Sequence, residues 1–219
     1  MRLEKLKMPM NKKVCKICFE EYKISGFSSI FNPNQVICYS CLLSLEPKFI
    51  SFEEEGVKCL SIYNYDETIK KLLYQFKGCF DKELKDVFLN PYLLELKIRY
   101  FGYIIVPIPS YIEDDEERGF NHVEEIFSSL CLKEEKILTK NARMKQSSLS
   151  KKDREKISSV MVYKNKIDLS NKKVLIVDDV LTTGSTMSAC IKLISKCKPK
   201  QISFLVMSYT CRKNVVFDD

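Results

Sequence analysis

The segment that most constrains the fold is VLIVDDVLTTGSTM, residues 174–187. It begins with four consecutive apolar residues, as expected of a strand that is buried on both faces of a sheet. Two carboxylates follow, Asp178 and Asp179, and then hydroxyl residues around a single Gly184 that lead into a helical pattern. This order is typical of an open α/β sheet, in which ligands bind at the carboxyl ends of the strands.

The hydroxyl-rich part of this segment predicts a phosphate site. Gly184 permits a left-handed backbone, so that successive N–H groups and the following helix N-terminus can point at an anion. The expected phosphate ligands are Thr182, Thr183, Gly184, Ser185 and Thr186. Neither a Walker A loop nor a dinucleotide fingerprint is present. A plain strand, turn and helix cap is the alternative, but it explains only one acid and one hydroxyl.

Other segments extend the α/β pattern. Strands are expected at residues 59–65, 103–109 and 202–207, and helices at 67–76, 123–130 and 185–195. Asp66 is expected to cap the first of these helices. Strands that alternate with helices predict an α/β domain with a mainly parallel sheet.

Four cysteines near the N-terminus form two C-x-x-C pairs: Cys15, Cys18, Cys38 and Cys41. Each pair can turn two thiolates toward one point, and four thiolates complete a tetrahedron with no coordination position left for water. The spacing matches structural zinc sites. Unmetallated or redox-active cysteines are the alternative.

The composition of the chain restricts its cellular location and its possible ligands. Its 219 residues are 45% hydrophobic and 30% charged, with a net charge of +7. No apolar run approaches the length of a membrane helix, and no secretory signal precedes the cysteines, so a cytoplasmic protein is expected. Residues 133–173 hold 13 basic and 5 acidic side chains. This surplus could attract nucleic acid or a small polyanion, or it could belong to a solvated loop.

Taken together, these motifs resemble a known family. VDDVLTTGST is similar to the phosphoribosyl pyrophosphate (PRPP) motif of type I phosphoribosyltransferases. The four cysteines, VPIPS at residues 106–110, RGFN at 118–121 and QSSLSKKDR at 146–154 occur in the order seen in the ComF (ComFC-like) family, which is associated with DNA uptake in natural competence. Two positions depart from the family pattern: His122 stands where Gln is common, and Ile157 where Asn is common.

The resemblance implies a zinc ribbon at residues 1–50 and a phosphoribosyltransferase-like domain at 51–219. It implies that Asp178 and Asp179 receive the ribose hydroxyls and that Mg²⁺ accompanies PRPP. Further residues expected to contact the pyrophosphate are Ile108, Pro109 and Ser110 in one loop, Arg118, and Arg143, Lys145 and Arg154 in a basic loop. The basic loop, residues 140–156, is expected to close over the ligand. His122 is expected either at a helix surface or cap, or as a general base.

Three functions stay open at this point: an enzyme that transfers phosphoribose to an unknown acceptor, a protein that binds PRPP or a nucleotide without turnover, and a competence factor that binds single-stranded DNA or other competence proteins. Turnover separates the first two, and a salt-dependent DNA affinity indicates the third.

Overall fold

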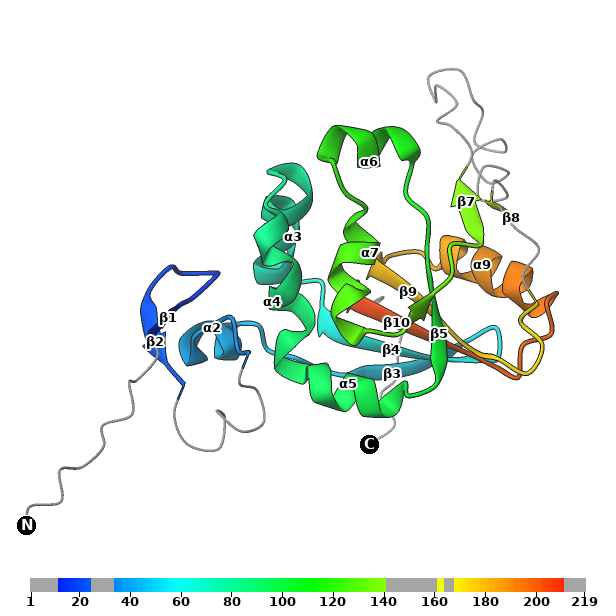
Figure 1. Cartoon of the computed structure of the whole chain (residues 1–219), viewed down its shortest axis with the longest axis horizontal. Coiled ribbons are helices and arrows are strands. Elements are labelled where there is room, and N and C mark those ends of the chain that lie inside the picture. Colours follow the sequence, from blue (N-terminus) through cyan, green and yellow to red (C-terminus); the bar gives the residue numbers. More distant parts are fainter. Residues whose placement is uncertain (1–11, 25–33, 141–160, 164–167, 211–219) are drawn as a thin grey trace, which may run out of the picture.

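The computed structural model describes residues 12–24, 34–140, 161–163 and 168–210. Its centre is a six-stranded sheet with the strand order β3-β4-β10-β9-β5-β6 (Figure 1). The first strand pairs antiparallel with its neighbour, and the other five run parallel. The strands are β3 Ile50–Glu54, β4 Val57–Asn64, β5 Tyr103–Pro107, β6 Lys133–Glu134, β9 Lys173–Leu181 and β10 Gln201–Tyr209.

Helices cover both faces of this sheet. On one face, side chains of α3, α4, α5 and α7 share a core with alternate residues of the strands, such as Val177 and Leu205. On the other face α9 packs against the intervening residues, such as Ile176 and Val206. The helices are α3 Glu67–Gly78, α4 Lys85–Leu89, α5 Leu93–Arg99, α6 Ile112–Arg118, α7 His122–Phe127 and α9 Ser185–Ser195, with short 3₁₀ turns η1 Lys82–Leu84, η2 Asn90–Tyr92 and η3 Ser128–Leu130. Burial on both faces explains why these strands are almost continuously apolar.

The N-terminal cysteines lie on a hairpin and a short helix. β1 Lys12–Val14 pairs antiparallel with β2 Glu21–Lys23, and α2 Tyr39–Ser44 follows. Cys15, Ile37 and Leu45 of this part belong to the same core cluster as buried side chains of α3 and α4. Ile50, the last residue of the predicted first domain, is the first residue of β3. A last pair of strands, β7 Leu138–Lys140 and β8 Met161–Tyr163, is antiparallel.

Several expectations from the sequence are confirmed here. The parallel α/β architecture is present, and α9 has the predicted bounds. Asp66 caps α3, since its side chain accepts a hydrogen bond of 2.9 Å from the backbone N–H of Ile69. Among the described helices, none has the length and apolar character needed to cross a bilayer.

Candidate functional site

The predicted phosphate turn lies between β9 and α9. β9 continues to Leu181, so the two acids are its sixth and seventh residues and lie within the strand instead of following its end, as the sequence had suggested. Pairing with β10 holds them there, because Asp178 lies opposite Val206. Gly184 has a φ of +75° and caps the eleven-residue α9, as expected. The Thr183 and Ser185 hydroxyls are exposed and 3.0 Å apart.

Asp179 is the meeting point of three elements. It is buried, with 6% of its surface exposed. The amine of Lys77, on the last turn of α3, forms a close ion pair with Asp179 Oδ2. The imidazole of His122, at the start of α7, places Nε2 3.6 Å from the same oxygen. The carboxylate therefore holds α3 and α7 against the carboxyl end of β9.

The pKa values of the two neighbouring acids are shifted in opposite directions. Burial and the negative charge of Asp179 raise the pKa of Asp178 well above its ordinary value. Burial also acts to raise the pKa of Asp179, but the polar interaction with the nearby His122 imidazole and the charge of Lys77 outweigh it and hold this pKa low. Asp179 is thus the firmly ionised member of the pair, while the charge on Asp178 is unfavourable in this structure.

His122 is itself positioned by Arg118. An N–H of the guanidinium lies 3.1 Å from His122 Nδ1, and the same nitrogen lies 3.1 Å from Asp115 Oδ1. Since arginine can only donate, Nδ1 must accept, which leaves the ring proton on Nε2 facing Asp179. His122 is buried, and it contacts the motif rather than standing at a helix surface.

The loop after β5 approaches the same end of the sheet. The N–H of Ile108 donates to the carbonyl of Val177 (2.9 Å), and the Ile108 side chain is buried in the core. Ser110 donates to Asp115 (2.6 Å) and accepts from Asn121 (2.9 Å). Asn121 also caps α7 by accepting from the N–H of Glu124. The predicted pyrophosphate loop is therefore braced by α6 and α7, and Pro109 stands half-exposed within it.

The four cysteines form a compact cluster. Their sulfur atoms all lie within 4.8 Å of one another. The backbone N–H groups of Ile17 and Cys38 point at the sulfur of Cys15, at 3.4 and 3.3 Å. Burial acts to raise the Cys15 pKa, but hydrogen bonds from the backbone N–H groups of Cys18, Cys38 and Ile17 lower it to about 7. The arrangement fits a tetrahedral metal ion of the structural kind.

Some predicted residues cannot be placed, and one important residue was missed. Arg143, Lys145 and Arg154, with Ile157 and most of the basic loop, lie outside the described residues. Lys77 was not predicted, because it is one lysine among several on α3 and lies 102 residues from Asp179 in the sequence. Only the tertiary fold brings the two together.

The segment that carries these residues is similar to known proteins. A family model described as a phosphoribosyl transferase domain matches residues 119–214, which contain both acids and the β9–α9 turn. The chain is 29% identical to competence protein ComFC of Streptococcus pneumoniae over 150 residues, which are 68% of this chain and 67% of that protein. The sequence of this chain is thus similar to that of ComFC proteins. ComFC of Bacillus subtilis is also 29% identical, over 147 residues, or 65% of this chain and 60% of that protein.

These ComFC proteins are therefore matched over only about two thirds of their length or less. Among solved structures, a hypoxanthine-guanine phosphoribosyltransferase from Bacillus anthracis is 13% identical and covers 63% of this chain and 76% of that chain, with a TM-score of 0.40. The phosphoribosyltransferase type of the fold follows from the family model and the sheet.

Proposed function

We propose that this ComFC-like chain binds PRPP together with Mg²⁺ at the carboxyl end of β9 and transfers its phosphoribosyl group to an acceptor. The observation that carries this proposal is the left-handed Gly184 at the N-terminus of α9, directly after a strand that bears two adjacent carboxylates. The turn would receive the 5′-phosphate through Thr182, Thr183, Gly184, Ser185 and Thr186, because the backbone N–H groups of such a turn and a helix N-terminus favour a dianion.

The carboxylates suit the ribose and the metal ion. Asp178 accepts one hydrogen bond, from the N–H of Asp179 at 2.9 Å, and is only half-buried, so it has capacity to accept from a hydroxyl. A hard cation such as Mg²⁺ prefers these oxygens and phosphate oxygens, and when bound it would neutralise the charge of the pyrophosphate. A bound cation would also relieve the unfavourable charge of Asp178, which supports this pair as its site.

The remaining predicted contacts take less direct parts in the proposal. Ser110 would face the pyrophosphate through its backbone N–H. Ile108 and Pro109 would position this loop, since the Ile108 N–H donates to Val177 and proline has no N–H. Arg118 contacts Asp115 and His122 in this structure, so a direct contact with pyrophosphate requires it to leave them. Arg143, Lys145 and Arg154 stay candidates from the sequence.

Two further parts of the proposal rest on the cysteines and the relatives. We propose that Cys15, Cys18, Cys38 and Cys41 hold one structural Zn²⁺, as supported by their mutual distances. Because the two relatives are competence proteins, we propose a role in natural competence, with action in the cytoplasm. Binding of single-stranded DNA, the alternative from the sequence, is a separate experiment with its own salt dependence.

Calorimetry with PRPP and Mg²⁺ tests the central proposal. Hydrogen bonds to charged groups contribute roughly 1.5 to 3 kcal/mol each. The paired change Asp178→Ala with Asp179→Ala should therefore cost on the order of 3 kcal/mol, or about a hundredfold in affinity. The matched Asn pair keeps the shape and removes the charge, so it should also lose most of the magnesium dependence.

Asp168→Ala is the control, because this exposed carboxylate lies before β9 and hydrogen bonds only locally to Ser170. Wild-type affinity in the Ala pair would show that the segment is only a strand and a turn. Release of pyrophosphate in the presence of an acceptor separates an enzyme from a protein that binds PRPP without turnover.

A further inference from the structure

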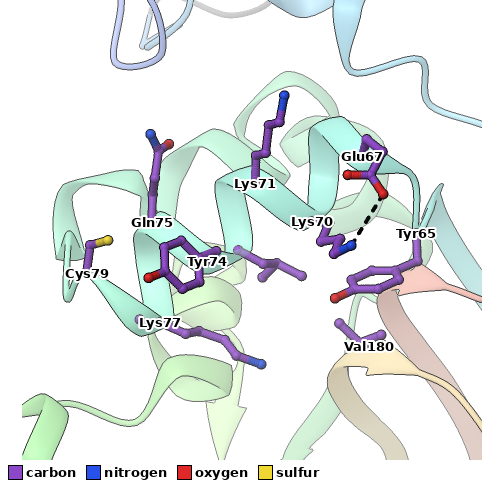
Figure 2. Close-up of a pocket in the computed structure, with 11 residues that line it drawn as sticks. Tyr65, Glu67, Lys70, Lys71, Tyr74, Gln75, Lys77, Cys79 and Val180 are labelled. Atoms are coloured by element: carbon purple, nitrogen blue, oxygen red, sulfur yellow. Dashed lines mark hydrogen bonds and ion pairs between the residues drawn. The ribbon is translucent and has the colours of Figure 1, made fainter.

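A pocket of about 770 Å³ lies between α3 and the carboxyl ends of β4 and β9. Figure 2 shows Tyr65 and Val180 on one side of it and Tyr74 and Lys77 on the other. Its volume falls within the range of roughly 300 to 1,000 Å³ that is usual for small-molecule sites. The pocket is therefore large enough for a single ring system with its substituents.

The position of the pocket ties it to the proposed PRPP site. Val180, which lines it, is the residue after Asp179. Lys77, which also lines it, forms the ion pair with Asp179 described above. A molecule in this pocket would thus lie beside the carboxylates that we assign to the ribose, where an acceptor must be to reach C1.

The walls of the pocket indicate the chemistry of its occupant. The rings of Tyr65 and Tyr74, with the aliphatic side chains of Leu73 and Val180, offer a largely apolar surface that suits a flat ring. Three lysines and one acid line the pocket. The acid, Glu67, pairs with Lys70 at 3.3 Å, and Lys77 pairs with Asp179, so one positive charge is left over. This excess of positive charge complements an anionic substituent.

We propose that the pocket receives a planar aromatic or heteroaromatic acid as the phosphoribosyl acceptor, an inference that rests on the proposed PRPP site. A ring or amino nitrogen of the acid attacks C1 of PRPP, and the bond between C1 and the pyrophosphate oxygen breaks. The electron pair leaves with pyrophosphate, and the proton of the nitrogen passes to water. The carboxylate of the acid faces Lys70 and Lys77 and shares their amines with Glu67 and Asp179.

Anthranilate is a suitable probe because it carries the ring, the carboxylate and an amino nitrogen, and it is fluorescent. The protein has no tryptophan, so the fluorescence of the probe can be followed without interference. Tyr74→Ala removes a side chain that is 68% exposed, which leaves the fold intact. Loss of one aromatic contact should weaken anthranilate about fivefold, or ~1 kcal/mol. Lys70→Gln should weaken it about threefold.

Two variants provide matched controls. Tyr39 on α2 is 69% exposed, and Tyr39→Ala should leave anthranilate affinity unchanged. Lys192 pairs with Glu55 at 3.1 Å, much as Lys70 pairs with Glu67. Lys192→Gln should therefore also leave anthranilate affinity unchanged. Anthranilamide, which lacks the negative charge, should bind the wild-type protein more weakly than anthranilate does.

PRPP affinity is measured in parallel, so that the two proposals fail in different ways. Weaker anthranilate binding in Tyr74→Ala and Lys70→Gln, with PRPP affinity retained, supports the pocket as the acceptor site. Anthranilate that fails to bind the wild-type protein with or without Mg²⁺ and PRPP, or binds Tyr74→Ala as well as wild type, overturns the pocket assignment. If anthranilate binds at the pocket but PRPP does not bind, the PRPP proposal fails and the acceptor role fails with it.

Discussion

The raised pKa of Asp178 predicts that Asp178→Asn makes the protein more stable at neutral pH. Burial and the charge of Asp179 both disfavour the ionised form of Asp178 in the folded chain. The folded-state pKa of Asp178 is therefore above its unfolded-state pKa. Below the unfolded-state pKa the carboxyl group is protonated in both states, so it does not lower the free energy of unfolding. As the pH rises between the two values, the wild-type protein loses up to ~1.4 kcal/mol of stability per pH unit from this group.

Asparagine avoids that loss and keeps the local geometry. Its Oδ1 can accept the hydrogen bond that Asp178 receives from the N–H of Asp179. We expect Asp178→Asn to exceed wild type by ~1 kcal/mol or more at pH 7.5, with a smaller gap at pH 4.5. With urea slopes of roughly 1 to 3 kcal/mol per molar, this moves the midpoint by about 0.3 to 1 M.

Urea unfolding followed by circular dichroism, at several pH values, measures this gap. Asp168→Asn is the control with the opposite sign: a hydrogen bond from Ser170 lowers the pKa of this exposed acid, so removal of its charge should not stabilise the protein at pH 7.5. An Asp178→Asn protein that is less stable than wild type at pH 7.5, or whose advantage does not grow with pH, would refute the reasoning. The same variant should bind PRPP more weakly, because it removes a carboxylate that we assign to the PRPP site. Functional sites often retain such a charge at the expense of stability.

Three further outcomes are expected. Protein purified without added metal should contain about one zinc per chain by elemental analysis, and Cys38→Ser with Cys41→Ser should reduce this below about half an equivalent. Gly184→Ala should cost ~1 to 2 kcal/mol in thermal unfolding because φ is +75°, although the added Cβ meets nothing closer than 3.9 Å. The control Gly56→Ala, at a φ of +73°, should lose similar stability without losing PRPP affinity. Asn121→Ala should cost ~1 to 2 kcal/mol in urea unfolding by removing the cap of α7, and an unchanged midpoint would contradict that role.

Local signals explain what the sequence predicted well. Asp66 and the helical spacing after it determine the start of α3, and Gly184 determines the start of α9, because caps act within one turn. The antiparallel edge strand β3 and the short helices α4 and α5 were not predicted. β3 is a short edge strand, and the two helices are five and seven residues long, so each offers little periodicity for recognition.

The part of the candidate site that is contiguous in the sequence could be predicted, but the contacts between residues distant in the sequence could not. The acids and the turn lie within ten residues and could be found together, although the continuation of β9 to Leu181 depends on pairing with β10. The contacts of Asp179 with Lys77 and His122 join α3, α7 and β9. No periodicity or motif encodes such a meeting, because it depends on how the helices pack on the sheet.

The same helix connects the cysteine cluster with this site. Lys16, inside the first C-x-x-C pair, donates to the Glu83 carbonyl (2.9 Å) and to Asp86 (3.1 Å), just after α3. Four buried side chains of α3 share a core with Cys15, and its last turn delivers Lys77 to Asp179. Packed interiors transmit displacements because they contain few voids. A metal ion that fixes the cysteine loops would therefore also fix α3, and with it one wall of the pocket and one partner of the motif.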